Sequence, residues 1–515
     1  MTVTSPPGRG SQASADPAST KTSSTKSPST RAARTKPANT DATSAASTKR
    51  AVPVALALAA ASLPMFMSTL DNLVMTSALP VIQRALSADV EQLQWMMNSY
   101  TLAFATLMLP AATLGDRWGR RRVFLIGIAV FTFASIGSAL STTTGALITA
   151  RALQGVGAAA IMPLSLTLLA AAVPAARRAM AIGVWGGVSG LGVALGPVIG
   201  GAVVDGFSWE AIFWLNVPVA VVAVPLILRA LPESHGRRQP LDLVGLALVG
   251  VGVLSAVWGI VRAGDLGWGS ASVTSALVAG AALIAAFIWH ESRTTYPLVP
   301  LRLFRSRSFS VANVAGLAFT LGMFGAVFLL AQYLQIVDGY TPLEAGIRTL
   351  PWTAAPMIVA PIAGLLAPRV GVRVLLGLGL TLQAMGLAWL AVGAGATTPY
   401  ADLVPGFILA GVGMGLTFAP SATAVLADMA PHDHATASST NSTIREIGVA
   451  LGVAVLVAVF RANGGTLTPA GYDSGLRMAI LTGAAVVALG AVSTLWLPRA
   501  GARALAMAPV PSPVS

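Results

Sequence analysis

Cysteine is absent from this chain of 515 residues, and charged residues make up only 10% of it. The missing thiols exclude disulfide bonds, thiolate catalysis and metal sites built from cysteine. A typical soluble chain carries roughly 25% charged residues, whereas hydrophobic residues here reach 55% and the mean hydropathy is +0.74. A water-soluble protein cannot bury that much apolar surface, so the composition excludes an ordinary cytosolic enzyme.

Positive charge is plentiful by comparison, with a formal net charge of +13. Such values also occur in nucleic-acid-binding proteins, but the basic residues here stand between apolar segments, so we expect no nucleic-acid partner. Residues 1–50 are rich in Ser, Thr, Ala and Pro, and they contain eight Lys or Arg residues without any apolar run. That composition predicts a disordered basic tail, because it cannot bury enough apolar surface to fold.

Apolar segments recur from residue 51 onward, each long enough to cross the ~30 Å hydrocarbon layer as a helix. Their continuous apolarity disfavours a β-barrel, whose strands alternate polar and apolar residues. The sequence predicts an all-α integral membrane protein with fourteen transmembrane helices, an even number that places both termini on one side. The expected spans are 53–80, 94–114, 123–141, 146–172, 179–204, 211–231, 242–262, 273–290, 309–335, 343–367, 373–393, 402–427, 441–461 and 475–497.

The distribution of Lys and Arg indicates which side is cytoplasmic. The side that carries both tails holds 26 of them and the opposite side five, while Arg151 lies within a span. Cytoplasmic loops carry an excess of Lys and Arg. We therefore expect a multi-pass protein of the plasma membrane with both termini in the cytoplasm.

A weak internal repeat divides the spans into two halves. Residues 112–121 (ATLGDRWGRR) and 364–373 (GLLAPRVGVR) share an Arg-x-Gly-x-Arg pattern, and each joins the second and third spans of a six-span unit. Duplicated halves of this kind are typical of transporters. The predicted units are a tail at 1–50, a six-helix bundle at 51–235, two inserted transmembrane helices at 236–300, a second six-helix bundle at 301–500 and a cytoplasmic tail at 501–515.

Four segments together resemble motifs of the major facilitator superfamily, specifically its fourteen-span drug:proton antiporters. LDNLVMTSALP (70–80) is similar to the first-helix signature, and ATLGDRWGRRR (112–122) to the loop motif after the second helix. ITARALQGVGAAAIMP (148–163) resembles the fourth-helix motif with its central arginine, and GLGVALGPVIGG (190–201) the antiporter motif of the fifth helix. Three residues depart from the usual patterns: Leu73, Thr76 and Ala112.

The resemblance implies a major facilitator fold and a monomeric, proton-coupled exporter of small lipophilic or cationic compounds, such as drugs or antibiotics, that works by alternating access. It assigns the antiporter motif to a rigid helix contact that suppresses leak, although small residues at this spacing also serve plain helix packing. It assigns the loop motif to a charge-paired latch at the cytoplasmic gate, where simple anchoring by arginine is the alternative. The motif residues are Gly192, Gly196, Pro197, Gly200 and Gly201 in the helix, and Asp116, Arg117, Gly119, Arg120 and Arg121 in the loop.

Asp71 and Arg151 are the chief ionisable residues deep within spans, where charge is expensive and usually functional. A buried acid that approaches and leaves an arginine would release and capture a proton, so we expect this pair to couple transport to protons. A purely structural pair is the alternative. By family analogy, five polar or aromatic residues are expected to line a substrate cavity: Tyr100, Gln154, Gln332, Tyr333 and Gln335.

The chain contains no ATP-binding motif G-x-x-x-x-G-K-[ST], so we expect no cofactor and a proton gradient as the energy source. No metal site is expected. A dedicated exporter of a native metabolite, without a multidrug role, is the first alternative. A non-transporting membrane sensor or enzyme is the second, but no convergent His, Asp or Ser cluster supports catalysis, so an enzyme is not expected.

The topology can be tested with reporter fusions. Reporters placed after residue 505 and in the 235–240 loop are expected in the cytoplasm, and one at 265–270 is expected outside, because the basic loops stay on the cytoplasmic side. A C-terminal reporter found outside would contradict the fourteen-span count.

Overall fold

The computed structural model describes residues 53–236, 240–395, 398–430 and 433–498, and this part of the chain forms helices and no strand. The tails expected at 1–50 and 501–515 lie outside the described residues. Thirteen helices in the described part are long and apolar enough to cross a membrane. The expected span 94–114 lies in a further helix of 29 residues, α2, whose polar residues, such as the buried Gln94 and Asn98, keep it outside that group.

The helices of the first half are α1 (Val54–Leu86), α2 (Val90–Trp118), α3 (Arg120–Ala139), α4 (Thr144–Ala172), α5 (Ala175–Gly206), α6 (Ala211–Trp214) and α7 (Asn216–Ala230). Two inserted helices follow, α8 (Leu243–Leu266) and α9 (Ala271–Glu291). The second half contains η1 (Leu301–Arg305), α10 (Arg307–Ile336), α11 (Pro342–Arg348), α12 (Leu350–Thr353), α13 (Ala355–Val370), α14 (Val372–Gly393), α15 (Tyr400–Leu426), α16 (His434–Ala462), α17 (Pro469–Ser493) and η3 (Thr494–Trp496).

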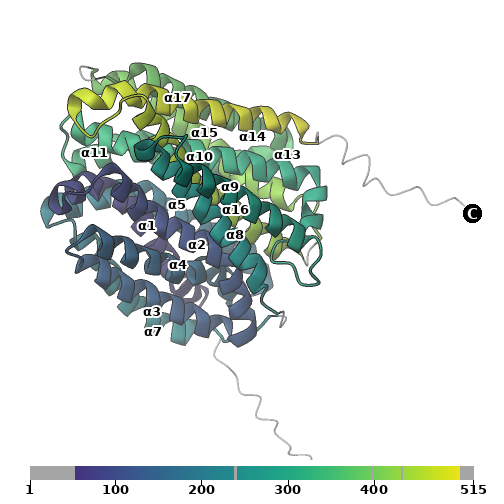
Figure 1. The fold of residues 1–515 in the computed structure, drawn as a ribbon. Helices are drawn as coiled ribbons and strands as arrows, with labels where there is room; N and C mark the ends of the chain where they lie inside the picture. Colours follow the sequence, from purple (N-terminus) through teal and green to yellow (C-terminus); the bar gives the residue numbers. More distant parts are fainter. Residues whose placement is uncertain (1–52, 237–239, 396–397, 431–432, 499–515) are drawn as a thin grey trace, which may run out of the picture. The chain divides into compact units, whose positions relative to one another are not determined.

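These helices form two bundles with a hairpin between them. In the first bundle α4 packs on α2 and α3, and α1 packs on α5 and α7; in the second, α10 packs on α16 and α17, and α14 on α15. The inserted α8 and α9 pack on each other, and α8 also contacts α2 and α16, one helix from each bundle (Figure 1). The two six-helix pseudo-repeats and the inserted pair agree with the predicted fold class.

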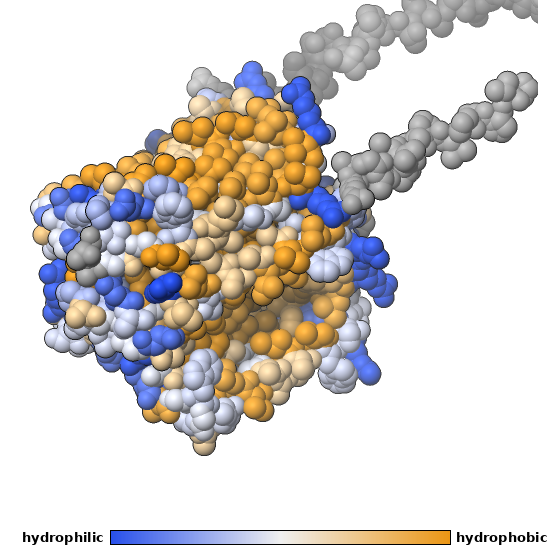
Figure 2. Space-filling view, turned by 90° about the horizontal axis from the view of Figure 1, so that it is seen from above, coloured by the Kyte–Doolittle hydropathy of each residue, from blue (hydrophilic) through white to orange (hydrophobic). Residues whose placement is uncertain are grey.

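The surface agrees with a membrane location. Large apolar side chains such as Phe133, Val221, Ile358 and Leu365 are more than half exposed. Figure 2 shows a broad hydrophobic band on this face of the molecule, with hydrophilic residues toward its two edges. A soluble protein would not leave so wide an apolar surface in water.

The repeat seen in the sequence recurs in the backbone. Gly119 stands between α2 and α3 with φ of 111°, and Gly371 stands between α13 and α14 with φ of 90°. Residues with a Cβ rarely adopt such angles, so glycine is needed at both turns. The glycines of the two Arg-x-Gly-x-Arg segments thus share the same backbone conformation.

Two expected spans are interrupted. The segment expected as one span at 343–367 forms α11, α12 and α13, with Pro351 and Pro356 near the starts of the last two helices. The segment expected at 211–231 is divided into α6 and α7 around Leu215. Proline lacks a backbone donor and its ring crowds the preceding turn, so it favours such breaks.

Helix α16 begins at His434, seven residues before the expected start of its span at 441. Its first turns, HATASSTNST, are polar yet helical, so hydropathy does not reveal them. Arg445 and Glu446 lie within the helix, at positions that also fall inside the expected span 441–461.

The bundles meet closely where α5 ends and α11 begins. A Cβ on Gly201 would lie 2.3 Å from the carbonyl oxygen of Pro342, and one on Gly346 would lie 2.3 Å from that of Pro197. We call the side of the membrane on which α1 begins the near side, and the other the far side. Because consecutive spans alternate in direction, this contact lies on the far side.

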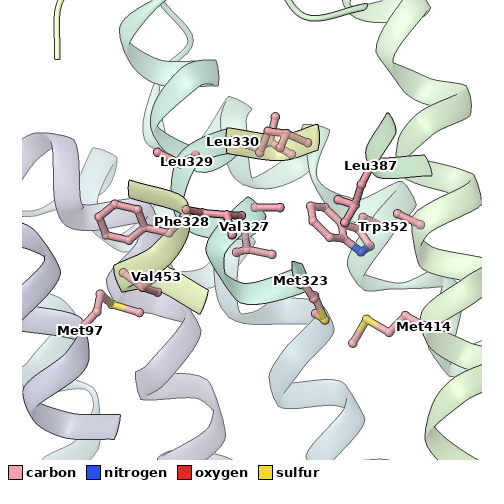
Figure 3. Close-up of a cluster of buried hydrophobic side chains, with 14 of the residues drawn as sticks. Met97, Met323, Val327, Phe328, Leu329, Leu330, Trp352, Leu387, Met414 and Val453 are labelled. Carbon is pink, nitrogen blue, oxygen red and sulfur yellow. The ribbon is translucent and has the colours of Figure 1, made fainter. Parts of the chain in front are cut away.

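The same level of the protein contains an apolar core shared by both bundles. Met97 of α2 lies opposite Val453 of α16, with Phe328 of α10 close by (Figure 3). Met323, Trp352 and other buried side chains of the second bundle continue this core (Figure 3). On the far side, the two bundles are therefore joined by buried apolar side chains as well as by the backbone contact between α5 and α11.

Toward the near side, glycines of α5 and α13 have no close neighbours. In the described part of the chain, a Cβ on Gly183, Gly186, Gly187 or Gly190 of α5 would meet no atom within 4 Å, and the same holds for Gly364 of α13. The tight glycine contacts of α5 are therefore confined to its far-side half.

The far-side contact can be tested with Gly346→Val. The new side chain would collide with the α5 backbone, which cannot move as a flexible side chain can, so the bundles should part there. Because the chain has no cysteine, a single Thr76→Cys variant can report the change, as Thr76 is 2% exposed beneath the contact. We expect Gly346→Val to raise the rate of thiol labelling at position 76 several-fold.

Gly187→Val is the matched control, since it adds the same atoms where a Cβ has open space. It should leave labelling at position 76 unchanged. Equal labelling rates in the two variants would show that the α5–α11 contact does not close the far side.

Candidate functional site

The first bundle contains a buried polar network centred on Asp71 of α1. Its carboxylate forms an ion pair with Arg151 of α4, and both side chains are almost completely buried, with 2% and 0% exposure. Gln154 of α4 donates to Oδ1 of Asp71 over 3.1 Å. The Asp71, Arg151 and Gln154 predicted from the sequence thus lie together in one site.

The guanidinium of Arg151 is held on several sides. Its Nη1 also donates to Oε1 of Gln154 over 3.1 Å, and Nε donates to the Met96 carbonyl oxygen over 3.4 Å. Its Cζ lies 4.4 Å from the ring centroid of Tyr100, a cation–π contact. The hydroxyl of Tyr100 lies 3.0 Å from Oγ of Ser68. Tyr100, predicted to line a cavity, instead packs against the charge pair.

The sequence did not point to Asn216 of α7. Its Nδ2 donates to Oδ1 of Asp71 and to Oγ of Ser135, each over 2.8 Å. Ser138 donates to Oε1 of Gln154 over 3.1 Å. The available signal was an asparagine in the apolar run FWLNVPVA, where an amide is costly without partners.

The remaining cavity candidates lie apart from this network, on α10. Gln332 donates to the Phe328 carbonyl of its own helix over 3.0 Å, and the Tyr333 hydroxyl donates to the Gly395 carbonyl over 2.9 Å. Gln335 reaches the first bundle, where its Nε2 donates to the Ser77 carbonyl over 3.0 Å. Of these three α10 residues, Gln335 is the one whose side chain forms a hydrogen bond to the other bundle in the described part of the chain.

Gln335, Ser77 and Pro197 border a small cavity beneath the far-side contact, with about 20 Å³ of space for the centres of water molecules. That is room for about one water. The Ser77 hydroxyl donates to the Pro197 carbonyl over 3.1 Å, and Thr353 of α12 donates to the Ala194 carbonyl over 3.2 Å. Hydroxyls from both bundles thus bond to carbonyls of α5 near its proline.

The glycines of the antiporter motif lie on two faces of α5, one toward α1 and one toward α11. A Cβ on Gly192, Gly196 or Gly200 would come within 3.2 Å of residues of α1, whereas Gly201 faces α11. Pro197 lies within α5, which continues as one helix to Gly206. The motif therefore fixes α5 against its own bundle and against the other one.

The loop motif makes contacts within the first bundle. Asp116 accepts from Nε of Arg120 over 2.7 Å, and the backbone nitrogen of Arg120 donates to the Ser234 carbonyl over 2.9 Å. Arg117 is exposed, and no hydrogen bond or ion pair of its side chain occurs among the described residues. The expected latch between Asp116 and a partner helix is not formed in this arrangement.

Glu233 is a residue of this loop region that the sequence reasoning missed. Its carboxylate accepts from the backbone nitrogens of Arg121 over 2.9 Å and Arg122 over 3.2 Å, at the first turn of α3. The Arg121 side chain donates to the Leu231 carbonyl over 3.2 Å. A carboxylate at a helix N-terminus satisfies its free donors and favours its dipole.

A second pair of intramembrane charges lies on α16. Arg445 places its Cζ 4.8 Å from the ring centroid of Phe418, and Oε2 of Glu446 is buried with no hydrogen-bond partner in the described part of the chain. The Glu446 carboxylate is close enough to Tyr100, in the first bundle, for the two side chains to interact electrostatically.

One carboxyl outside the spans is perturbed. Burial raises the pKa of Asp338, in the far-side loop after α10, from its ordinary 3.8 to about 6, and Asp473 adds to the rise. A group that binds its proton more tightly in the folded state stabilises that state as the pH falls through 6. We therefore expect the folded protein to gain stability as the pH falls through 6.

The arrangement of two pseudo-repeated helical bundles around buried charges defines a class, that of secondary transporters. A solved bacterial homolog of the human lysosomal transporter Spinster is 17% identical, with a TM-score of 0.63, and covers 86% of this chain and 96% of that chain. The xylose transporter XylE from E. coli is 12% identical, with a TM-score of 0.60, over 87% and 98%. These likenesses establish the fold.

The sequence profile of the Major Facilitator Superfamily matches residues 61–453, and the chain belongs to this family of transporters. Multidrug resistance protein Stp of Mycobacterium tuberculosis is 37% identical over 79% of this chain and 76% of its own. The Tetracenomycin C resistance and export protein of Streptomyces glaucescens is 35% identical, over 80% and 77%. The Methylenomycin A resistance protein of Streptomyces coelicolor is 33% identical, over 87% and 93%.

The energetic link between Asp71 and Arg151 can be measured with a double-mutant cycle. Arg151→Met leaves a buried carboxylate without its cation, and losing one partner of a buried pair costs about 3–5 kcal/mol. The double variant Asp71→Asn/Arg151→Met removes both charges, so its melting temperature in detergent should lie above that of Arg151→Met alone. If the two single effects simply add, the residues are not coupled.

Proposed function

We propose that this protein is a proton-coupled exporter of small lipophilic organic compounds, working by alternating access between its two bundles. The observation that carries the proposal is the fully buried Asp71–Arg151 pair. Ionisable groups at such depth are costly and mark ion or proton pathways. The relatives named for multidrug resistance and antibiotic export support the class of cargo.

In the proposed cycle Asp71 carries the proton. Its carboxylate has one cationic donor and two amide donors, from Arg151, Gln154 and Asn216. A movement between α1 and α4 that withdraws Arg151 would leave a buried acid without its cation, and it would take up a proton. Proton uptake on one side and release on the other would then drive export.

We propose that the near side is cytoplasmic, with both termini there and the protein in the plasma membrane. Cargo would then enter from the cytoplasm along the near-side half of α5, whose glycines have open space, while α5 and α11 close the outside. On turnover the near side would close, and Asp116 and Arg117 of the loop motif would engage the other bundle. The proposed unit is a monomer that uses no cofactor.

A dedicated exporter of one native metabolite is the second candidate. The observation in its favour is that several Streptomyces relatives are named for single compounds. Accumulation of a panel of labelled compounds in expressing cells, with and without a protonophore, separates the two. Export of one chemical class alone favours the dedicated exporter, and export of unrelated lipophilic compounds favours the multidrug role.

Asp71→Asn tests the proton pathway directly. The change keeps the size of the side chain but removes its titration, so gradient-driven uphill transport in proteoliposomes should be abolished. Asp402→Asn is the control, because Asp402 is an exposed carboxylate in the first turn of α15, outside the network. Full uphill transport by Asp71→Asn under an imposed pH gradient would refute Asp71 as the coupling carboxylate.

A further inference from the structure

A separate pocket lies where the inserted hairpin meets both bundles. It has a volume of about 310 Å³ and is bordered by α2, α8, α9, the segment before α10 and α16. Val253, Phe287 and Ile447 are among its apolar walls, and Thr440 and Thr443 of α16 also border it. It is distinct from the Asp71 network and from the small cavity at Gln335.

Two hydroxyls at this pocket lack partners. Oγ1 of Thr440 and of Thr443 are buried, and neither forms a hydrogen bond in the described part of the chain. Threonine in a membrane helix usually donates to a carbonyl one turn earlier. Thr320, Thr381 and Thr417 do so here, over 3.0, 2.8 and 2.8 Å. Leaving a buried hydroxyl unpaired is unfavourable, and a bound hydrogen-bond acceptor would supply the missing partner.

The rim of the pocket is fixed by hydrogen bonds. Glu291 at the end of α9 accepts from the backbone nitrogens of Leu298 over 3.2 Å and Val299 over 3.0 Å, and both residues border the pocket. His290 lies 2.9 Å from Oδ1 of Asp242, which also caps α8. The hairpin is thereby tied to the segment that leads into the second bundle, so the pocket is a preformed cavity.

We propose that this pocket binds a neutral, lipophilic small molecule that carries a hydrogen-bond acceptor such as a carbonyl. The walls supply apolar contact, and the hydroxyls of Thr440 and Thr443 supply the polar contacts that orient the ligand, as in most small-molecule sites. The volume is at the lower end for ligand pockets, about 300–1,000 Å³. It suits a compact compound and is too small for a phospholipid with two acyl chains.

The site gives the inserted helices a role. Because α2 belongs to the first bundle and α16 to the second, any movement between the bundles changes the shape of the pocket. Its occupant would thus be bound in one state of the cycle more tightly than in another. The identity of the occupant as transported cargo rests on the proposed function, whereas the binding itself does not.

Benzophenone is a suitable probe, since it is neutral, apolar and has one carbonyl acceptor that also reacts with nearby C–H bonds under light. The full-length protein in lipid nanodiscs would be irradiated with benzophenone, and the labelled peptides located by mass spectrometry. We expect labelling concentrated around residues 249–253, 287–288 and 440–447. Thr440→Val/Thr443→Val should reduce it several-fold, and Val253→Phe should do so by filling the space.

Thr381→Val/Thr482→Val is the matched control, because both hydroxyls are exposed or half-exposed elsewhere and bond to their own helices over 2.8 Å. It should leave pocket labelling unchanged. Unchanged labelling in both pocket variants, labelling spread evenly over lipid-facing helices, or complete displacement by added phospholipid would overturn the proposal. No gradient or transport is needed, so loss of transport activity with intact labelling would refute only the proposed function.

Discussion

A charge inside the hydrocarbon layer must find a partner within the protein, and the first bundle is arranged around that constraint. The Asp71 carboxylate on α1 is neutralised by Arg151 on α4, and its other oxygen takes amide donors from α4 and from Asn216 on α7. Each donor comes from a helix that packs on α1. The relative positions of these helices are therefore set by the need to satisfy one buried acid.

Both bundles also contain buried polar groups without partners. Arg445 on α16 stacks on an aromatic ring, Glu446 has an oxygen without a partner, and two nearby threonine hydroxyls are unpaired among the described residues. In the first bundle, Nη2 of Arg151 and the side-chain amide of Asn98 are likewise buried with no hydrogen-bond partner in the described part of the chain. Such groups are costly in a membrane interior.

Close approach of backbones is the second constraint, and glycine provides it. At Gly201 and Gly346 a side chain would collide with a carbonyl oxygen of the opposite helix. The two bundles can approach this closely on the far side because both positions lack a side chain. Nearer the other end of α5, glycines meet nothing. The same residue type thus permits a close contact at one end of α5 and has open space around it toward the other end.

The sequence alone determined the helical membrane fold, the repeat with its two Arg-x-Gly-x-Arg segments, and the charge pair, because hydropathy, residue patterns and the cost of buried charge are local properties of a segment. Tertiary structure decided the rest. It alone shows the role of Asn216, the capping by Glu233, the start of α16 at His434 and the unpaired threonines, because these depend on which helices become neighbours. A single polar residue in an apolar run looks alike in sequence whether it meets a carboxylate, its own backbone or an empty pocket, and only packing distinguishes these outcomes.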